Sequence, residues 1–273
     1  MTSGLIIEGA SYRYAGAGER SLQSVGLVLM PGRVVGVAGA NESGKSTLCL
    51  VAGGLAPRVI GGRLEGSVRI DGADTAALPV YDLAQRCGVL FQNAAAQLSG
   101  TTATVFEEIS FGPCNLGLPV SDVLGRVRWA LGAVGIEELA PRDPARLSGG
   151  QAQLVALASV LALRPRYLIL DEPTSELDPA GTALVADALA RVARETGAGI
   201  LLVEHKTDVL ARIADEVVVL AAGSVALAGP AADVLADPRL PELGVEPPAR
   251  IRLEREVRAA GLDWSVALAE AIV

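Results

Sequence analysis

A glycine-rich loop between a predicted strand and a predicted helix constrains the fold more than any other stretch. It reads Gly39-Ala40-Asn41-Glu42-Ser43-Gly44-Lys45-Ser46, which matches the phosphate-binding pattern G-x-x-x-x-G-K-[ST]. Before it, the apolar residues 34–38 predict a buried strand, and after it residues 48–52 predict a helix. A chance glycine-rich turn would lack these flanks. The loop therefore predicts an α/β core in which backbone N–H groups and a helix N-terminus bind phosphate.

The side chains of this loop suit nucleotide phosphates and Mg²⁺. The ammonium group of Lys45 can reach the β- and γ-phosphates, and the hydroxyl of Ser46 can ligate Mg²⁺. We therefore expect the phosphates to be bound by Gly39, Asn41, Gly44, Lys45, Ser46 and Thr47.

Two carboxylates follow a second apolar run. Residues 167–170 predict a buried strand, and Asp171 and Glu172 come directly after it. A carboxylate at such a strand end can hold Mg²⁺, and the next one can orient and deprotonate the water that attacks a γ-phosphate. A solvated acidic turn is the alternative interpretation. The glycine-rich loop upstream and Pro173-Thr174 downstream favour the metal and catalytic roles.

The composition bounds the class of protein. The chain has 273 residues, of which 51% are hydrophobic but only 3% aromatic, so aliphatic side chains must build its core. No apolar run reaches the roughly 18 residues of a membrane span, and residues 1–8 lack the basic region of a signal peptide. Three widely spaced cysteines suit a reducing cytosol. A net charge of −8 without a long basic run argues against nucleic acid as a partner.

Hydrophobic periodicity predicts alternating strands and helices, with a helical stretch from residue 93 to 163. The other predicted strands are 5–7, 22–30, 66–71, 89–91, 198–203, 215–220 and 224–228, and the predicted helices are 122–134, 148–163 and 179–195. We expect Ser121 or Asp122 to cap the first of these helices. Residues 237–248 contain four prolines and should be irregular, and residues 250–273 should form one or two short helices.

One pentapeptide carries a family resemblance. Leu147-Ser148-Gly149-Gly150-Gln151, between the loop and Asp171, is similar to the signature of ATP-binding cassette (ABC) ATPases. Three further family marks occur in order: Gln92 resembles the Q-loop glutamine, residues 175–178 resemble the D-loop, and His205 resembles the switch histidine. The resemblance covers roughly residues 4–230.

An aromatic residue near the N-terminus also matches the family pattern. Tyr14 resembles the side chain that stacks on adenine, but Tyr12 lies two residues away on the same predicted strand face. Either tyrosine can instead be plain core packing. We expect Tyr14 to be the adenine contact.

The resemblance implies a RecA-like P-loop α/β fold in three parts. Residues 1–92 and 164–229 form the nucleotide-binding core with an N-terminal antiparallel β layer. Residues 93–163 form a helical signature subdomain, and residues 230–273 form a short C-terminal extension.

The resemblance also implies ATP and Mg²⁺ as cofactors and a role for each site residue. Ser46, Gln92 and Asp171 would hold Mg²⁺, while Lys45, Gln92, Glu172 and His205 would act in catalysis. The signature residues Ser148, Gly149, Gly150 and Gln151, together with Asp178, would contact ATP across a dimer interface. The second ATPase subunit would be another copy of this chain or a paralogue.

A narrower resemblance lies after Gln92. The run Phe91-Gln92-Asn93 … Thr104-Val105-Phe106-Glu107-Glu108 … Phe111-Gly112-Pro113 … Asn115-Leu116-Gly117 is similar to ATPases of energy-coupling factor (ECF) transporters, including cobalt and nickel uptake ATPases. It implies a peripheral subunit on the cytoplasmic face of the membrane. Its partners would be a transmembrane T-component and a substrate-binding S-component, for uptake of a vitamin or a transition-metal ion.

Three alternatives remain open at this stage. The chain can serve a different ABC importer or an exporter, it can be a non-transport ABC ATPase of DNA repair or translation, or it can be an inactive regulatory cassette. The acidic charge, the absence of a long coiled-coil insertion and the complete catalytic set argue against the last two. The chain departs from the family pattern at four places. Glu42 stands where a glycine is usual, and Glu176 replaces a small residue in the D-loop. Residues 94–96 are alanines in place of the usual Pro-Asp type residues, and residues 152–154 lack the basic residues common after the signature.

Overall fold

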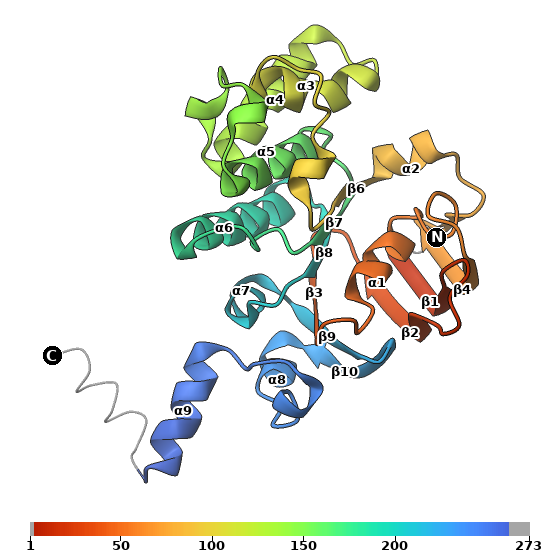
Figure 1. Cartoon of the computed structure of the whole chain (residues 1–273), viewed down its shortest axis with the longest axis vertical. Coiled ribbons are helices and arrows are strands. Elements are labelled where there is room, and N and C mark those ends of the chain that lie inside the picture. Colours follow the sequence, from red (N-terminus) through yellow and green to blue (C-terminus); the bar gives the residue numbers. More distant parts are fainter. Residues whose placement is uncertain (1–2, 262–273) are drawn as a thin grey trace, which may run out of the picture.

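The computed structural model describes residues 3–261, and these form two β-sheets flanked by helices (Figure 1). The larger sheet has the strand order β10-β9-β3-β8-β7-β6. All of its pairings are parallel except that of β10 with β9. Its strands are β3 (Val34–Gly39), β6 (Cys87–Leu90), β7 (Tyr167–Asp171), β8 (Gly199–Val203), β9 (Glu216–Ala221) and β10 (Ser224–Pro230).

The central strands β3, β8 and β7 are buried at every residue. Parallel strands covered on both faces need apolar side chains throughout, which explains the continuous apolar runs in the sequence. A helix follows each of them: α1 (Lys45–Ala52) after β3, α6 (Pro179–Thr196) after β7 and α7 (Thr207–Ile213) after β8. The carboxyl ends of the three strands therefore lie side by side at one edge of the sheet.

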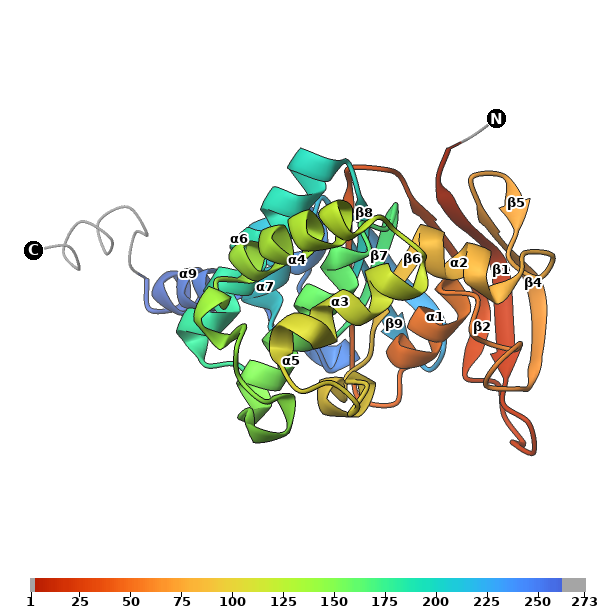
Figure 2. The ribbon, with the colours of Figure 1, turned by 90° about the horizontal axis from the view of Figure 1, so that it is seen from above.

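The smaller sheet is antiparallel and lies beside the larger one (Figure 2). Its order is β2-β1-β4-β5, formed by β2 (Leu22–Leu29), β1 (Leu5–Arg13), β4 (Arg63–Ile70) and β5 (Ala73–Asp74). Helix α1 contacts β1 of this sheet as well as β7 and β8 of the larger one. Leu48 of α1 shares a buried cluster with Leu5 and Leu29. The helix behind the glycine-rich loop is therefore held from both sides.

Three helices gather at one end of the larger sheet, near β6 (Figure 1). They are α3 (Val105–Asn115), α4 (Val120–Val134) and α5 (Gly149–Ala162), and α5 packs against the other two. Thr104 and Ser148 begin α3 and α5 with reciprocal capping boxes, in which the cap side chain accepts from the third backbone N–H of the helix. Every helix within the described residues is too short or too polar to span a bilayer.

The C-terminal part joins the core only in places. Helix α8 (Ala231–Leu235) packs on β9 and β10, and Leu240 and Val245 are buried in the main core. Residues 237–248 are irregular apart from one 3₁₀ turn, as predicted. Helix α9 (Ala249–Ala259) has no buried residue. It confirms one predicted C-terminal helix, and residues 262–273 lie outside the described residues.

Several local expectations need correction. Helices α2 (Val80–Arg86), α7 and α8 were not predicted, because they have seven residues or fewer and give little periodicity. The expected cap at Ser121 or Asp122 is wrong. Helix α4 begins at Val120, and Pro119 precedes it with φ −53° and ψ 143°. Proline fixes a φ close to that of a helix start, and Asp122 instead lies in the first turn, where its charge complements the helix dipole.

Tyr167 connects the two sheets. It is the first residue of β7, and its hydroxyl donates a 2.7 Å hydrogen bond to Oδ1 of Asp71, directly after β4. The same carboxylate accepts from the backbone N–H of Gly4 at 3.2 Å and pairs with Arg166 at 3.4 Å. Burial, followed by the hydrogen bond to Asp71, raises the pKa of Tyr167 to about 12.

We expect Tyr167→Phe to lower the free energy of unfolding by about 1 kcal/mol, because the ring is kept and only the hydrogen bond is lost. The pKa in the folded state lies above the ordinary tyrosine value of 10.0, so this stabilisation is present below pH 10 and lost as the pH rises through 12. Urea unfolding at neutral and alkaline pH measures both effects. Tyr81→Phe is the control, because Tyr81 is 65% exposed. Equal losses in the two variants would contradict this role.

Candidate active site

The glycine-rich loop closes around the ammonium group of Lys45. Its Nζ donates hydrogen bonds to the backbone oxygens of Gly39 at 2.9 Å and Ala40 at 2.8 Å. Gly44 has a φ of 103° and Gly39 a φ of 154°, and a Cβ atom at Gly39 would lie 2.4 Å from the carbonyl oxygen of Leu220. Glycine is required at these positions because a side chain has no space. The loop is thus preformed, with Lys45 at its centre.

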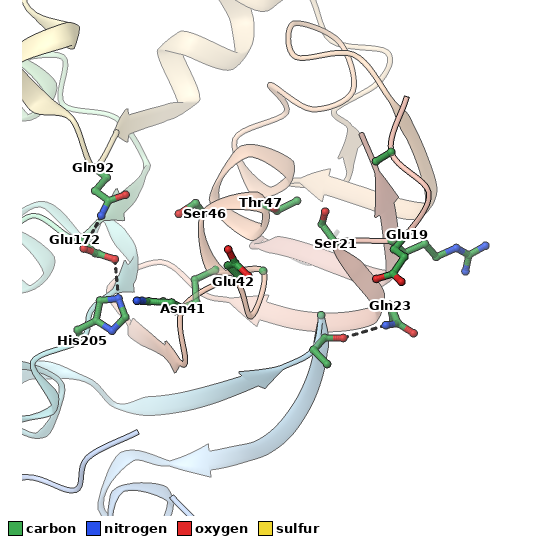
Figure 3. Close-up of a pocket in the computed structure, with 16 residues that line it drawn as sticks. Glu19, Ser21, Gln23, Asn41, Glu42, Ser46, Thr47, Gln92, Glu172 and His205 are labelled. Atoms are coloured by element: carbon green, nitrogen blue, oxygen red, sulfur yellow. Dashed lines mark hydrogen bonds and ion pairs between the residues drawn. The ribbon is translucent and has the colours of Figure 1, made fainter. Parts of the chain in front are cut away.

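A cavity of about 760 Å³ opens beside this loop (Figure 3). The predicted residues that line it are Asn41, Gly44, Lys45, Ser46, Thr47, Gln92, Glu172 and His205. Figure 3 shows Gln92, Glu172 and His205 on one side and Glu19, Ser21 and Gln23 on the other. The latter three were not predicted, because they lie around the start of β2 and reach the cavity only through the packing of the two sheets.

Asp171 ends β7 next to Ser46 and carries an unpaired oxygen. Its Oδ1 atom is buried without a hydrogen-bond partner in the described part of the chain. Burial is the largest cause of its raised pKa, and the hydroxyl of Ser46 opposes that shift. A buried carboxylate oxygen without a donor suits a hard cation. The predicted Mg²⁺ ligands Ser46 and Asp171 therefore fit the ion.

Glu172 joins the ends of three neighbouring strands. Its Oε2 accepts from Nε2 of Gln92, which follows β6, at 3.0 Å. Its Oε1 lies 3.0 Å from Nε2 of His205, which follows β8. Three predicted site residues thus meet in one hydrogen-bonded group (Figure 3). Burial lowers the pKa of Lys45, and the nearby charges of Glu172 and Asp171 act in the opposite direction.

One further residue at this site was not predicted. Gln153 of α5 is 1% exposed, and its Nε2 donates to the backbone oxygen of Glu172 at 3.2 Å. The backbone of Glu172 has a φ of 53°, a conformation that most residues avoid. Gln153 therefore connects the helix that begins at Ser148 to the carboxylate group. The only available signal was a polar residue on the apolar face of a helix.

The residues resembling the signature and the D-loop lie outside this cavity. Ser148 is the exposed N-cap of α5, and Gly149 and Gly150 form the first helical turn, followed by Gln151. Asp178 is the exposed N-cap of α6 and accepts from the backbone N–H of Gly181 at 2.7 Å. None of the five lines the wall around Lys45. The chain thus presents a second, separate set of helix N-terminal N–H groups.

The two tyrosines differ in their surroundings. Tyr12 is fully buried and packs edge-on against Tyr14, with ring centroids 4.9 Å apart. Tyr14 is only partly buried, and its hydroxyl lies 3.0 Å from Oγ1 of Thr47 in α1. Core packing thus accounts for Tyr12 and leaves Tyr14 near the loop. An adenine contact by Tyr14 stays a prediction.

Comparison with known proteins identifies the family. Residues 22–175 match the family model of the ABC transporter. The chain is 42% identical to the nickel import ATP-binding protein NikO of Rhodobacter capsulatus, over 86% of this chain and 92% of the relative. It is 38% identical to the energy-coupling factor transporter ATP-binding protein EcfA1 of Symbiobacterium thermophilum, over 94% and 90%. The chain belongs to the ABC transporter family.

Solved structures of ABC cassettes share this fold. CbiO1 of Clostridium perfringens, part of the ABC transporter complex CbiONQ, superposes with a TM-score of 0.75 at 32% identity, covering 88% of this chain and 96% of that one. The cassette MJ0796 in a dimeric post-hydrolysis state with ADP and phosphate gives a TM-score of 0.73 at 26% identity, covering 83% and 98%. The predicted RecA-like α/β fold and the assignment as an ATP-binding ABC ATPase are confirmed.

Glu42 stands where the ABC pattern usually has a glycine, and the structure shows where its side chain lies. It lines the cavity with its side chain exposed, and its φ is 62°. Glycine adopts this conformation without strain, whereas other residues are disfavoured there by roughly 1–2 kcal/mol. A carboxylate at this position also adds negative charge to the wall that contains Lys45.

We expect Glu42→Gln to tighten ADP binding about threefold at low ionic strength, because it removes repulsion between the carboxylate and the phosphates. The gain should shrink as salt screens the charges. Calorimetric titration at two salt concentrations tests both statements. Glu138→Gln, an equal charge change at an exposed position outside the cavity, is the control. Unchanged or weaker binding by the Glu42 variant would show that the carboxylate does not face the phosphates.

Proposed function

We propose that this ABC ATPase powers an ECF-type transporter, taking up a vitamin or a transition-metal ion. The observation that carries the catalytic part is the meeting of Gln92, Glu172 and His205 beside the Lys45 loop. The ECF part is supported by the likeness to EcfA1 and to NikO, whose names denote energy coupling and nickel import. It is also supported by the sequence run after Gln92.

In the proposed mechanism, the loop binds the triphosphate and Glu172 acts on water. The N–H groups of the loop and the Lys45 ammonium hold the β- and γ-phosphates. Glu172 accepts a proton from the water that attacks the γ-phosphate in line, and His205 holds the carboxylate through its 3.0 Å contact. His205 also lines the cavity, where its imidazole can donate to the γ-phosphate. The negative charge that develops on the phosphate oxygens during the reaction is stabilised by these N–H groups and the Lys45 ammonium, which are already in place.

Mg²⁺ belongs to the same proposal. When bound, it neutralises charge that develops on the phosphate oxygens. Ser46 and Asp171 would hold it, and the orphaned Oδ1 of Asp171 is the observation that supports this assignment. Gln92 uses its amide nitrogen to hold Glu172, which leaves its amide oxygen as the atom to complete the metal site.

The proposal includes a second ATPase subunit, either an identical copy or a paralogue. The N-termini of α5 and α6 expose N–H groups well suited to an anion, yet they do not line the cavity of their own chain. The side chain of Ser148 and these N–H groups would contact the γ-phosphate in the other subunit. The dimeric state of the similar cassette MJ0796 supports this arrangement.

We also propose where the membrane partner binds. An apolar cavity of about 230 Å³ lies between α2, the end of α5 and the end of β6, and is lined by Val80, Leu83, Ala84, Val89, Phe91, Val160 and Leu163. Val80 and Phe91 are 48% and 38% exposed although apolar. Phe91 adjoins Gln92 in sequence, so an occupant would touch the element that holds Glu172. We assign this groove to a helix of the T-component. The ATPase subunit would then lie on the cytoplasmic face of the membrane. Residues 93–163 would form its helical signature subdomain.

We expect Glu172→Gln to reduce ATP turnover by at least about 100-fold while leaving the affinity for ATP within about threefold. Glutamine keeps the shape of the side chain but cannot accept the proton. Phosphate release and equilibrium ATP binding measure the two quantities. Undiminished hydrolysis would remove Glu172 from the mechanism.

The docking groove is tested with a charge placed in it. We expect Val80→Asp to abolish copurification of the T-component from solubilised membranes without changing basal ATP hydrolysis, because a carboxylate cannot be desolvated against an apolar helix. Leu253→Asp on α9, at 51% exposure, is the matched control and should retain the partner. Mass spectrometry identifies what copurifies. Retention of the T-component by Val80→Asp would exclude the groove, and an ordinary permease pair or an exporter subunit would exclude the ECF type.

A further inference from the structure

The two residues that flank His205 both bind the turn after Glu172. Glu204 is 2% exposed, and its Oε1 accepts from the backbone N–H of Thr174 at 3.2 Å and from its Oγ1 at 2.7 Å. Burial raises the pKa of Glu204, and hydrogen bonds from Thr174 and the backbone N–H of Lys206 oppose that shift. A buried carboxylate is thus used to fix one turn residue.

Lys206 binds the same turn from the other side. Its Nζ donates to the backbone oxygen of Thr174 at 2.7 Å, to that of Leu177 at 3.2 Å and to Oγ1 of Thr182 at 3.0 Å. All three N–H groups of the ammonium have partners. Lys206 therefore connects the end of β8 both to the turn and to the first part of α6.

Thr174 is held at every polar atom it has. It is fully buried, its N–H and hydroxyl donate to Glu204, and its carbonyl accepts from Lys206. Backbone pairing adds the N–H of Glu172, which donates to the oxygen of Val203 at 3.0 Å. These hydrogen bonds fix the backbone next to Glu172 to the backbone next to His205, and these two residues carry the reacting side chains.

We propose that Glu204 and Lys206 are positioning residues for ATP hydrolysis, holding residues 173–178 against the strand end that carries His205. Neither lines the cavity, so neither touches the nucleotide. They act through Thr174 on the distance between Glu172 and His205, and through Leu177 and Thr182 on the N-terminus of α6. The general ABC pattern assigned a role to His205 in this stretch and none to its two neighbours.

Lys206→Met tests this proposal. Methionine fills a similar volume but leaves the carbonyls of Thr174 and Leu177 without their donor. We expect kcat for ATP to fall about tenfold while KM stays within about twofold, since the nucleotide contacts are intact and the Glu172–His205 geometry is not. Arg212→Met is the control, because it removes a nearby cation from α7, the helix that directly follows Lys206, and the partner of Arg212, Asp187, is exposed. An unchanged kcat, or equal changes in both variants, would overturn the proposal.

Thr174 provides a second test from the opposite side of the contact. Thr174→Val keeps the shape of the side chain and removes the hydroxyl bond to Glu204, whereas Thr174→Ser keeps that bond. We expect kcat to fall in the valine variant and to be largely retained in the serine variant, with thermal unfolding recorded for both. A purely structural role would instead lower the unfolding temperature and leave kcat per folded molecule unchanged, and that result would also overturn the proposal.

Discussion

The register of the parallel strands determines which side chains can meet at the site. Leu90 pairs with Leu170, Leu170 pairs with Leu202, and Asp171 pairs with Val203. Parallel strands in this register end at the same level, so the residues that follow them are presented together at one edge. The order of the strands brings the glycine-rich loop after β3 to the same edge. The buried and largely aliphatic strands therefore determine the catalytic geometry, because they decide where the residues at and after their carboxyl ends meet.

Opposite charges lie close together at this edge of the larger sheet. Lys45, Asp171 and Glu172 are all buried, and burial disfavours the ionised forms of Lys45 and Asp171. The backbone oxygens of the loop accept from Lys45, and Gln92 and His205 contact Glu172. Of the three ionisable side chains, only Asp171 has an oxygen that is buried without a hydrogen-bond partner in the described residues, where the Oγ atom of Ser43 in the loop is the one other such side-chain atom. The charged group left incomplete is thus the one assigned to a metal ion, which is consistent with a site built to receive MgATP.

The sequence was informative where chemistry depends on position along one strand or loop. Gly39, Lys45 and Asp171 follow apolar runs in the expected order, and the resemblance to ABC ATPases added His205 to the same predicted site. Gln153, Glu204 and Lys206 could not be predicted, because their partners are backbone atoms and threonine hydroxyls brought close only by tertiary packing. The same reason applies to the cavity wall formed by residues 19–23. The short helices α2, α7 and α8 were missed because local periodicity is too weak over two turns or fewer.

Two adjacent carboxylates can serve one site only because the backbone changes direction between them. Consecutive residues of a strand point to opposite faces, so Asp171 and Glu172 would diverge if β7 continued. Glu172 instead takes a φ of 53°, which ends the strand and turns its side chain toward Gln92 and His205. That conformation costs about 1–2 kcal/mol. Hydrogen bonds from Gln153, Ser175 and the backbone to Glu172, each contributing about 1 kcal/mol, offset this cost. The strain and the contacts that oppose it are therefore both part of how the site is formed.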